Sequence, residues 1–162
     1  MIAFEQLCHR LYGYAGLEHA RGATDSQIVE VERVLGVKLP DDYVLFLREF
    51  GWISLEGLEL YGVGDGVPAP WELVSSTIRE RQLAEPAIPN ILIPVMNDGA
   101  GNHYCLDMSR FSGGQCPVVF WDHEDRRGTQ QVPETVANSF VEWLWKQLDE
   151  LETYDADSDD GP

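Results

Sequence analysis

The first third of the chain places apolar side chains at the three- and four-residue spacing of amphipathic helices. Thr24 and Gln27 have the spacing of a capping box, while Gly13, Gly36 and Gly51 are natural helix stops. Three helices are therefore predicted, with these buried faces: Phe4, Leu7, Cys8 and Leu11; Ile28, Val31, Val34 and Leu35; Tyr43, Phe46, Leu47 and Phe50.

The pattern of apolar residues is less regular after the third helix. Pro40 suits the first turn of the third helix, and residues 52–61 are typical of brief strands and turns, because short apolar runs alternate with glycine. A fourth helix is predicted from Pro70 to about Leu83. Its expected buried stripe is Trp71, Val74 and Ile78.

Three strands are predicted in the second half of the chain. Residues 91–96 form a continuous apolar run typical of a strand buried on both faces, although Pro94 favours an edge or a bulge. Residues 103–107 and 117–121 are two more strands. The loop Ser112–Gln115 should join these two as neighbours.

Ser139 and Glu142 repeat the capping-box spacing before a strong last helix. Its apolar face holds Phe140, Leu144, Leu148 and Leu151. Helices thus cluster at both ends with strands between them, which predicts an α+β fold. The length of 162 residues suits a single domain, expected over 1–153, and residues 154–162 are too polar to pack and are expected to be a disordered acidic tail.

The charge narrows the classes of partner. The chain has 28 acidic residues against 11 Lys and Arg, a formal net charge of -17. Such a chain repels nucleic acid, but it is attracted to a basic protein. We therefore expect no direct nucleic-acid binding, and we expect no membrane partner because no apolar stretch is long enough to span a bilayer.

The chain carries no apolar leader near its start and no apolar run long enough for a membrane span, so we expect a cytoplasmic protein. Its three cysteines, Cys8, Cys105 and Cys116, are an odd number without CxxC spacing. They are expected to be reduced thiols rather than a disulfide framework.

The glycine-rich stretch from Asn97 to Asp107, NDGAGNHYCLD, invites three chemical interpretations. A phosphate loop would need a Lys followed by Ser or Thr, and none follows these glycines. A dinucleotide fingerprint would need a small residue where Tyr104 stands, and a calcium loop would need an oxygen ligand at Ala100. The stretch is better explained as a turn in which glycine permits positive φ before a strand.

Zinc binding and catalysis are weaker alternatives. His103, Cys105, Cys116 and His123 are a legitimate ligand set if they meet in space, but they lack the close pairs of structural zinc sites. Catalysis would require an activated Cys105 or carboxylates sharing a cleft. We assign no catalytic, cofactor-binding or metal-binding residue and expect a protein that is not an enzyme.

Five segments, in this order, resemble the SUKH superfamily, also called the Smi/Knr family. They are Leu39–Tyr43, Ile93–Pro94, Asp98–Asn102, Val119–Glu124 and Ser139–Leu144. The chain departs from the pattern after the third helix, where such proteins often carry Asn-Gly-Gly and this one has Phe50-Gly51-Trp52.

The resemblance implies an α+β domain with a central, mostly antiparallel sheet, flanking helices and no shared catalytic motif. Bacterial members resemble immunity proteins that bind and neutralise a partner polymorphic or contact-dependent toxin, which is often a nuclease. Fungal members act as regulatory interaction proteins. An acidic domain suits the first role, because a nuclease must be basic where it grips phosphates. A regulatory or scaffold interaction module without a toxin partner is the alternative.

Five residues are candidates for partner binding. Asp98, Asp122, Glu124 and Asp125 lie in predicted turns that could share one edge of the sheet, and Trp52 could be an aromatic anchor of the kind that dominates interface energetics. Trp71 is either a second anchor or a core residue, and its helical apolar neighbours favour the core.

Overall fold

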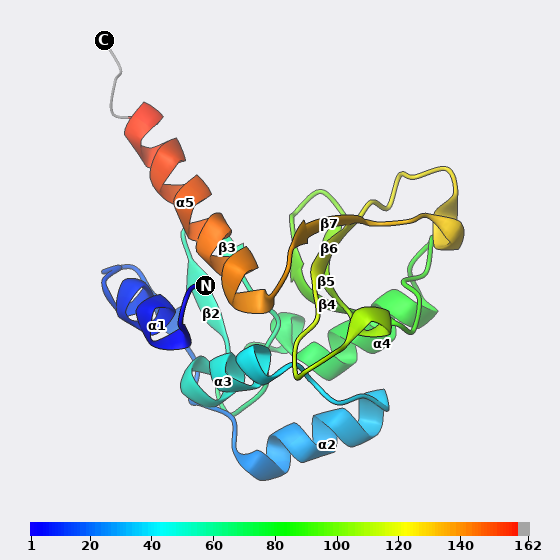
Figure 1. Ribbon diagram of the computed structural model, residues 1–162, viewed down its shortest axis with the longest axis horizontal. Helices are drawn as coiled ribbons and strands as arrows, with labels where there is room; N and C mark the ends of the chain where they lie inside the picture. The colour runs from blue at the N-terminus through cyan, green and yellow to red at the C-terminus, as the bar shows by residue number, and fades with distance from the viewer. Residues whose placement is uncertain (159–162) are drawn as a thin grey trace.

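The computed structural model describes residues 1–158, which form an α+β fold, as the sequence predicts (Figure 1). The helices are α1 Phe4–Tyr12, α2 Asp25–Leu35, α3 Asp41–Phe50, α4 Leu73–Gln82 and α5 Phe140–Ser158, with short 3-10 turns η1 Ala69–Trp71, η2 Met108–Arg110 and η3 Gly128–Gln130. The strands are β1 Glu18–His19, β2 Ile53–Leu55, β3 Leu58–Glu59, β4 Leu92–Asn97, β5 His103–Asp107, β6 Val118–Trp121 and β7 Glu134–Ala137.

The strands form two antiparallel sheets, of order β1-β2-β3 and β4-β5-β6-β7. The predicted pairing of 103–107 with 117–121 is confirmed, with His103 opposite Trp121. The expectation for Pro94 is also confirmed, because β4 is the outer strand of its sheet and its register shifts between Pro94 and Met96.

Local signals set the ends of the N-terminal helices. The Thr24 hydroxyl accepts from the Gln27 amide at 3.2 Å, and the Gln27 side chain accepts from the Thr24 amide at 2.9 Å, so the capping box is confirmed. Gly36 and Gly51, both with φ of 67°, follow α2 and α3. Pro40 lies at the N-cap of α3, one position before the first turn.

The main core joins α3 to α5. Tyr43 and Phe46 pack on Phe140 with ring centroids 4.8 and 5.1 Å apart. Asp42 lies beside these rings with its carboxylate buried. One carboxylate oxygen accepts from the Tyr43 amide at 2.9 Å and the other from the Val141 amide at 3.1 Å. This side chain therefore serves the positive ends of two helices that are far apart in sequence.

The buried face of α4 differs from the predicted stripe. The helix begins at Leu73, after Glu72 caps the amides of Val74 and Ser75, and its buried residues are Leu73, Ser76 and Thr77. Ile78 is 37% exposed. Because the side chains of Ser76 and Thr77 are small, this polar face of the helix can lie in the interior. A search for apolar periodicity does not detect such a buried face.

The last helix passes the predicted boundary of the domain. α5 continues to Ser158, so residues 154–158 are helical, whereas 159–162, the rest of the acidic tail, lie outside the described residues. Its first turns pack near β7, and farther along Asp149 and Glu152 pair with Arg10 of α1. The end of the helix projects from the rest of the molecule (Figure 1).

Candidate partner-binding surface

The turn between β4 and β5 is built around Asp98. Its Oδ1 accepts from the amides of Ala100 and Asn102 at 2.8 and 3.0 Å, and its Oδ2 accepts from the Asn102 side chain at 2.8 Å. Gly99 and Gly101 have φ of 82° and 99°, as the turn interpretation of the glycine-rich stretch predicts. Asp98 is exposed, so its negative charge faces solvent while the side chain holds the turn.

Asp122 organises the segment that follows β6. Its Oδ1 accepts from the Glu124 amide at 2.8 Å, and its backbone is held by Gln131, whose side chain bonds both the Asp122 amide and carbonyl. Gln131 is buried. Glu124 is exposed.

These two turns touch each other at one end of the four-stranded sheet. The Asn102 Oδ1 accepts from the His123 amide at 3.2 Å and lies 2.9 Å from the His123 Nδ1. A Cβ on Gly101 would lie 3.0 Å from the His123 ring, so the absence of a side chain there permits the close approach. The structure thus brings the turns that carry Asp98 and Asp122 together.

The four acidic candidates differ in how far they are neutralised. Asp125 pairs with Arg127 at 2.6 Å, and hydrogen bonds from Arg127 lower the pKa of Asp125 to about 2. Within residues 1–158, Asp98, Asp122 and Glu124 form no ion pair. These three carboxylates therefore leave the sheet end negative.

Trp52 does not fit the role of an aromatic anchor. It is only 6% exposed, and neighbouring segments lie close to it: its carbonyl accepts from the Ala20 amide, and a Cβ on Gly62 would lie 2.8 Å from the Trp52 Cβ. This burial corrects the expectation of an exposed Trp52. Trp71 is half-buried against the main core, 6.1 Å from the Tyr61 ring, which agrees with the core alternative.

His103, Cys105 and Cys116 lie in the interior, and Cys8 is half-buried. The His103 Nε2 is 3.3 Å from both the Tyr61 hydroxyl and the Asn97 Nδ2, and burial lowers the pKa of His103 against the opposing effect of Glu80. Burial raises the pKa of the Cys105 thiol. Among residues 1–158, no three side chains of His, Cys, Asp or Glu come together as a set of metal ligands.

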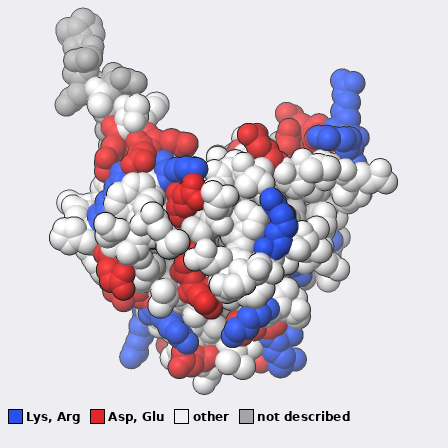
Figure 2. Space-filling view, viewed as in Figure 1, with Lys and Arg blue, Asp and Glu red and all other residues white. Residues whose placement is uncertain are grey.

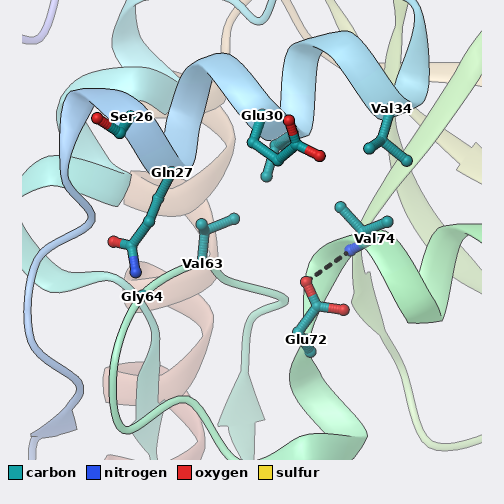
Figure 3. A pocket seen from close by; sticks show the side chains of 9 residues that line it. Ser26, Gln27, Glu30, Val34, Val63, Gly64, Glu72 and Val74 are labelled. Carbon is teal, nitrogen blue, oxygen red and sulfur yellow. Dashed lines mark hydrogen bonds between the residues drawn. The ribbon is translucent and has the colours of Figure 1, made fainter.

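A second surface feature was not foreseen from sequence. A groove of about 540 Å³ lies between α2 and the start of α4. Val34, Val63 and Val74 point into it, and Glu30 and Glu72 flank it (Figure 3). The pattern assigned Val34 to a buried face, yet it is 41% exposed in this groove. Its position at the edge of the apolar stripe of α2 was the available signal.

None of the helices in the part of the chain that the structure describes combines the length and the apolar character needed to span a bilayer.

Comparisons with known proteins agree with this architecture. A SUKH family model described as SMI1-KNR4 cell-wall matches residues 4–149. The chain is 26% identical to the SPbeta prophage-derived uncharacterized protein YokK of Bacillus subtilis (strain 168), over 85% of this chain and 80% of that protein. A solved structure of a protein from Pseudomonas syringae pv. tomato is similar in fold, with a TM-score of 0.61 and 19% identity over 88% of this chain and 92% of that one.

Proposed function

The chain belongs to the SMI1-KNR4 (SUKH) family, and on that premise we propose that it is an immunity protein which binds and neutralises a partner toxin. The toxin is a basic domain of a polymorphic or contact-dependent system, in our proposal a nuclease. The protein acts by stoichiometric binding in the cytoplasm rather than by catalysis.

The proposal that the partner is basic rests on one observation. Asp98, Asp122 and Glu124, which form no ion pair within residues 1–158, place carboxylates at one end of the sheet, in a chain whose formal net charge is -17. Complementary charge accelerates association and raises specificity, and a nuclease offers the matching basic surface where it binds phosphates. The similarity to a prophage-derived protein is compatible with a role in competition between bacteria.

The test is affinity capture from the native host with the tagged protein, at low and at high salt, followed by an activity assay of whatever binds. We expect one basic protein, bound stoichiometrically, whose toxicity or nuclease activity is silenced. Capture of a housekeeping complex without a toxic component would contradict the proposal and favour a regulatory module.

A charge reversal sharpens this test. Glu124→Lys changes an exposed carboxylate that makes no ion pair, and Glu18→Lys changes an exposed carboxylate on β1 by the same amount. We expect Glu124→Lys to weaken capture about tenfold and Glu18→Lys to have little effect. Equal effects of the two substitutions would show that overall charge, not the sheet end, attracts the partner.

A further inference from the structure

One face of the four-stranded sheet carries a continuous cross-strand row. Met96 lies opposite Tyr104, Tyr104 opposite Phe120, and Phe120 opposite Glu134. Directly opposed residues of antiparallel strands point to the same face of a sheet. The row therefore runs across all four strands, from β4 to β7.

α5 covers only part of this face. Leu106 and Val118, two residues along their strands from Tyr104 and Phe120, are fully buried in the core that contains Phe140 and Leu144 of α5. Tyr104 packs on Trp143 at 5.4 Å and on Phe120 at 5.3 Å, but both Tyr104 and Phe120 stay half-buried. The helix thus covers the row only in part: Met96 is buried, whereas Tyr104 and Phe120 keep part of their surface exposed.

The same face of α5 becomes exposed beyond that point. Trp143 and Gln147 are buried, Glu150 is exposed, and Tyr154 is 77% exposed. These residues follow one another at three- and four-residue spacing, so they share one face of the helix. The Gln147 side chain donates to the Glu150 carboxylate at 3.2 Å and holds it beside the sheet.

A hollow of about 260 Å³ lies at each end of the row. The hollow at Met96 is lined by Glu56, Leu58, Gln147, Glu150 and Tyr154. The hollow at Phe120 and Glu134 is lined by Asp122, Asp125, Arg127 and Val132. We call the aromatic row together with these two hollows the sheet-end trough.

The trough has an aromatic floor and an acidic rim. Glu56, Glu134 and Glu150 are exposed, and in residues 1–158 none of them forms an ion pair. Arg127, which lies in the second hollow, is neutralised by Asp125. Acidic side chains lie over the C-terminal half of α5 and over the loops at the sheet end, with a dip between them, and Lys or Arg side chains lie beside them at both places (Figure 2).

The pKa of Tyr104 is sensitive to these carboxylates. Burial raises the pKa of Tyr104, and the carboxylates of Glu150 and Asp98 raise it further. Carboxylates from α5 and from the β4–β5 turn therefore act on the same phenol from two different elements.

We propose that the sheet-end trough binds an arginine- and lysine-rich segment of a partner protein. Arginine planes and the aliphatic stems of lysine pack on Tyr104 and Phe120, and the cationic heads reach the carboxylates of the rim. The inference rests on the proposed function for its partner class, a basic protein, and adds the surface that receives it.

The groove beside α2 is a poorer match for a basic segment. Its Glu30 carboxylate pairs with Arg33 at 2.6 Å, and the Glu72 carboxylate accepts from the amides that begin α4, at 3.1 and 2.7 Å (Figure 3). Its valines offer apolar contacts without an aromatic ring. Charge complementarity therefore favours the trough over the groove.

The test uses a probe that does not depend on the toxin. A short peptide of alternating arginine and alanine is titrated at low salt into the full-length, ¹⁵N-labelled protein, and a glutamate-alanine peptide is the negative control. We expect the largest amide shifts along the row at Met96, Tyr104 and Phe120. Shifts centred on the groove, or spread evenly over the acidic surface, would overturn the proposal.

Two double variants with the same change of net charge provide the matched control. Glu134→Lys with Glu150→Lys alters the trough, whereas Glu18→Lys with Asp65→Lys alters exposed carboxylates that do not line it. We expect the first pair to weaken peptide binding at least about tenfold and the second less than about threefold. Equal weakening would show that bulk charge is responsible.

The outcomes separate this inference from the proposed function. If the peptide maps to the trough but no toxin is captured from the host, the surface stands and the immunity role fails. A toxin may be captured and silenced while Glu134→Lys with Glu150→Lys weakens neither peptide binding nor the toxin complex. In that case the immunity role stands, and the trough is not the binding surface.

Discussion

Asp42 offers a quantitative test of how the fold holds α5 in place. The residue is 7% exposed, and its carboxylate accepts from the Tyr43 amide in α3 and the Val141 amide in α5. Both amides belong to first turns, where backbone donors have no partner within their own helix. Replacing Asp42 with alanine leaves two buried donors unsatisfied.

The magnitude follows from these two hydrogen bonds. A buried donor that loses its partner costs about 1–3 kcal/mol, so two would cost about 2–6 kcal/mol. Burial of the carboxylate opposes this, since desolvation raises the pKa of Asp42 and its removal relieves that cost. We therefore expect Asp42→Ala to lower the free energy of unfolding by about 2–4 kcal/mol.

Urea unfolding, followed by tryptophan fluorescence, measures this loss. With an m-value of roughly 2 kcal/mol/M, a loss of 3 kcal/mol moves the midpoint down by about 1.5 M. Asp41→Ala is the control, because Asp41 is the exposed neighbour in the same helical turn and its removal should cost at most about 1 kcal/mol. A midpoint for Asp42→Ala no lower than that for Asp41→Ala would refute the reasoning.

Three further predictions concern individual side chains. The carboxylate of Asp125 should titrate by NMR near pH 2, and Arg127→Gln should raise its pKa toward the ordinary value of about 3.9, because the hydrogen bonds from Arg127 favour the ionised form; an unchanged titration would contradict the ion pair. Burial raises the pKa of the Cys105 and Cys116 thiols, to about 12 for Cys116, so these two thiols should react with a thiol reagent at pH 8 only after unfolding. Fast reaction of either one in the native protein, mapped apart from that of the half-buried Cys8, would support a catalytic cysteine. Glu56, with φ of 49° in a two-residue hairpin turn, should gain about 0.5–1 kcal/mol of stability on replacement by asparagine, measured by urea unfolding; a loss of stability would show that its side chain holds the turn.

Much of the fold could be predicted because the signals are short-range. The capping box of α2 joins residues three apart, and the glycine at the end of α3 acts on its own backbone. Pro94 cannot donate to a ladder, so its place on an outer strand with a register shift follows from its chemistry. The prediction failed for the apolar stripe of α4, since a helix can bury small polar side chains as Ser76 and Thr77 do, and it also failed for Val34 and for strand β7.

The candidate site was predictable only in part. The turn residues Asp98, Asp122 and Glu124 were located from glycine and charge alone, and their turns do share one sheet end. The role of Trp52 was wrong because exposure of an aromatic ring depends on which segments pack over it. Tyr104 and Phe120 looked like ordinary strand residues, and no pattern in the chain shows where a helix stops covering a sheet.

The sequence by itself determined the α+β class, most helix ends and the excess of negative charge, because these depend on composition and on contacts within a few residues. The tertiary structure decided which charges are neutralised, which aromatic rings reach the surface, and how Asp42 meets a helix 99 positions away. The physical reason is that burial and ion pairing arise between segments distant in the chain. Only packing brings those segments together.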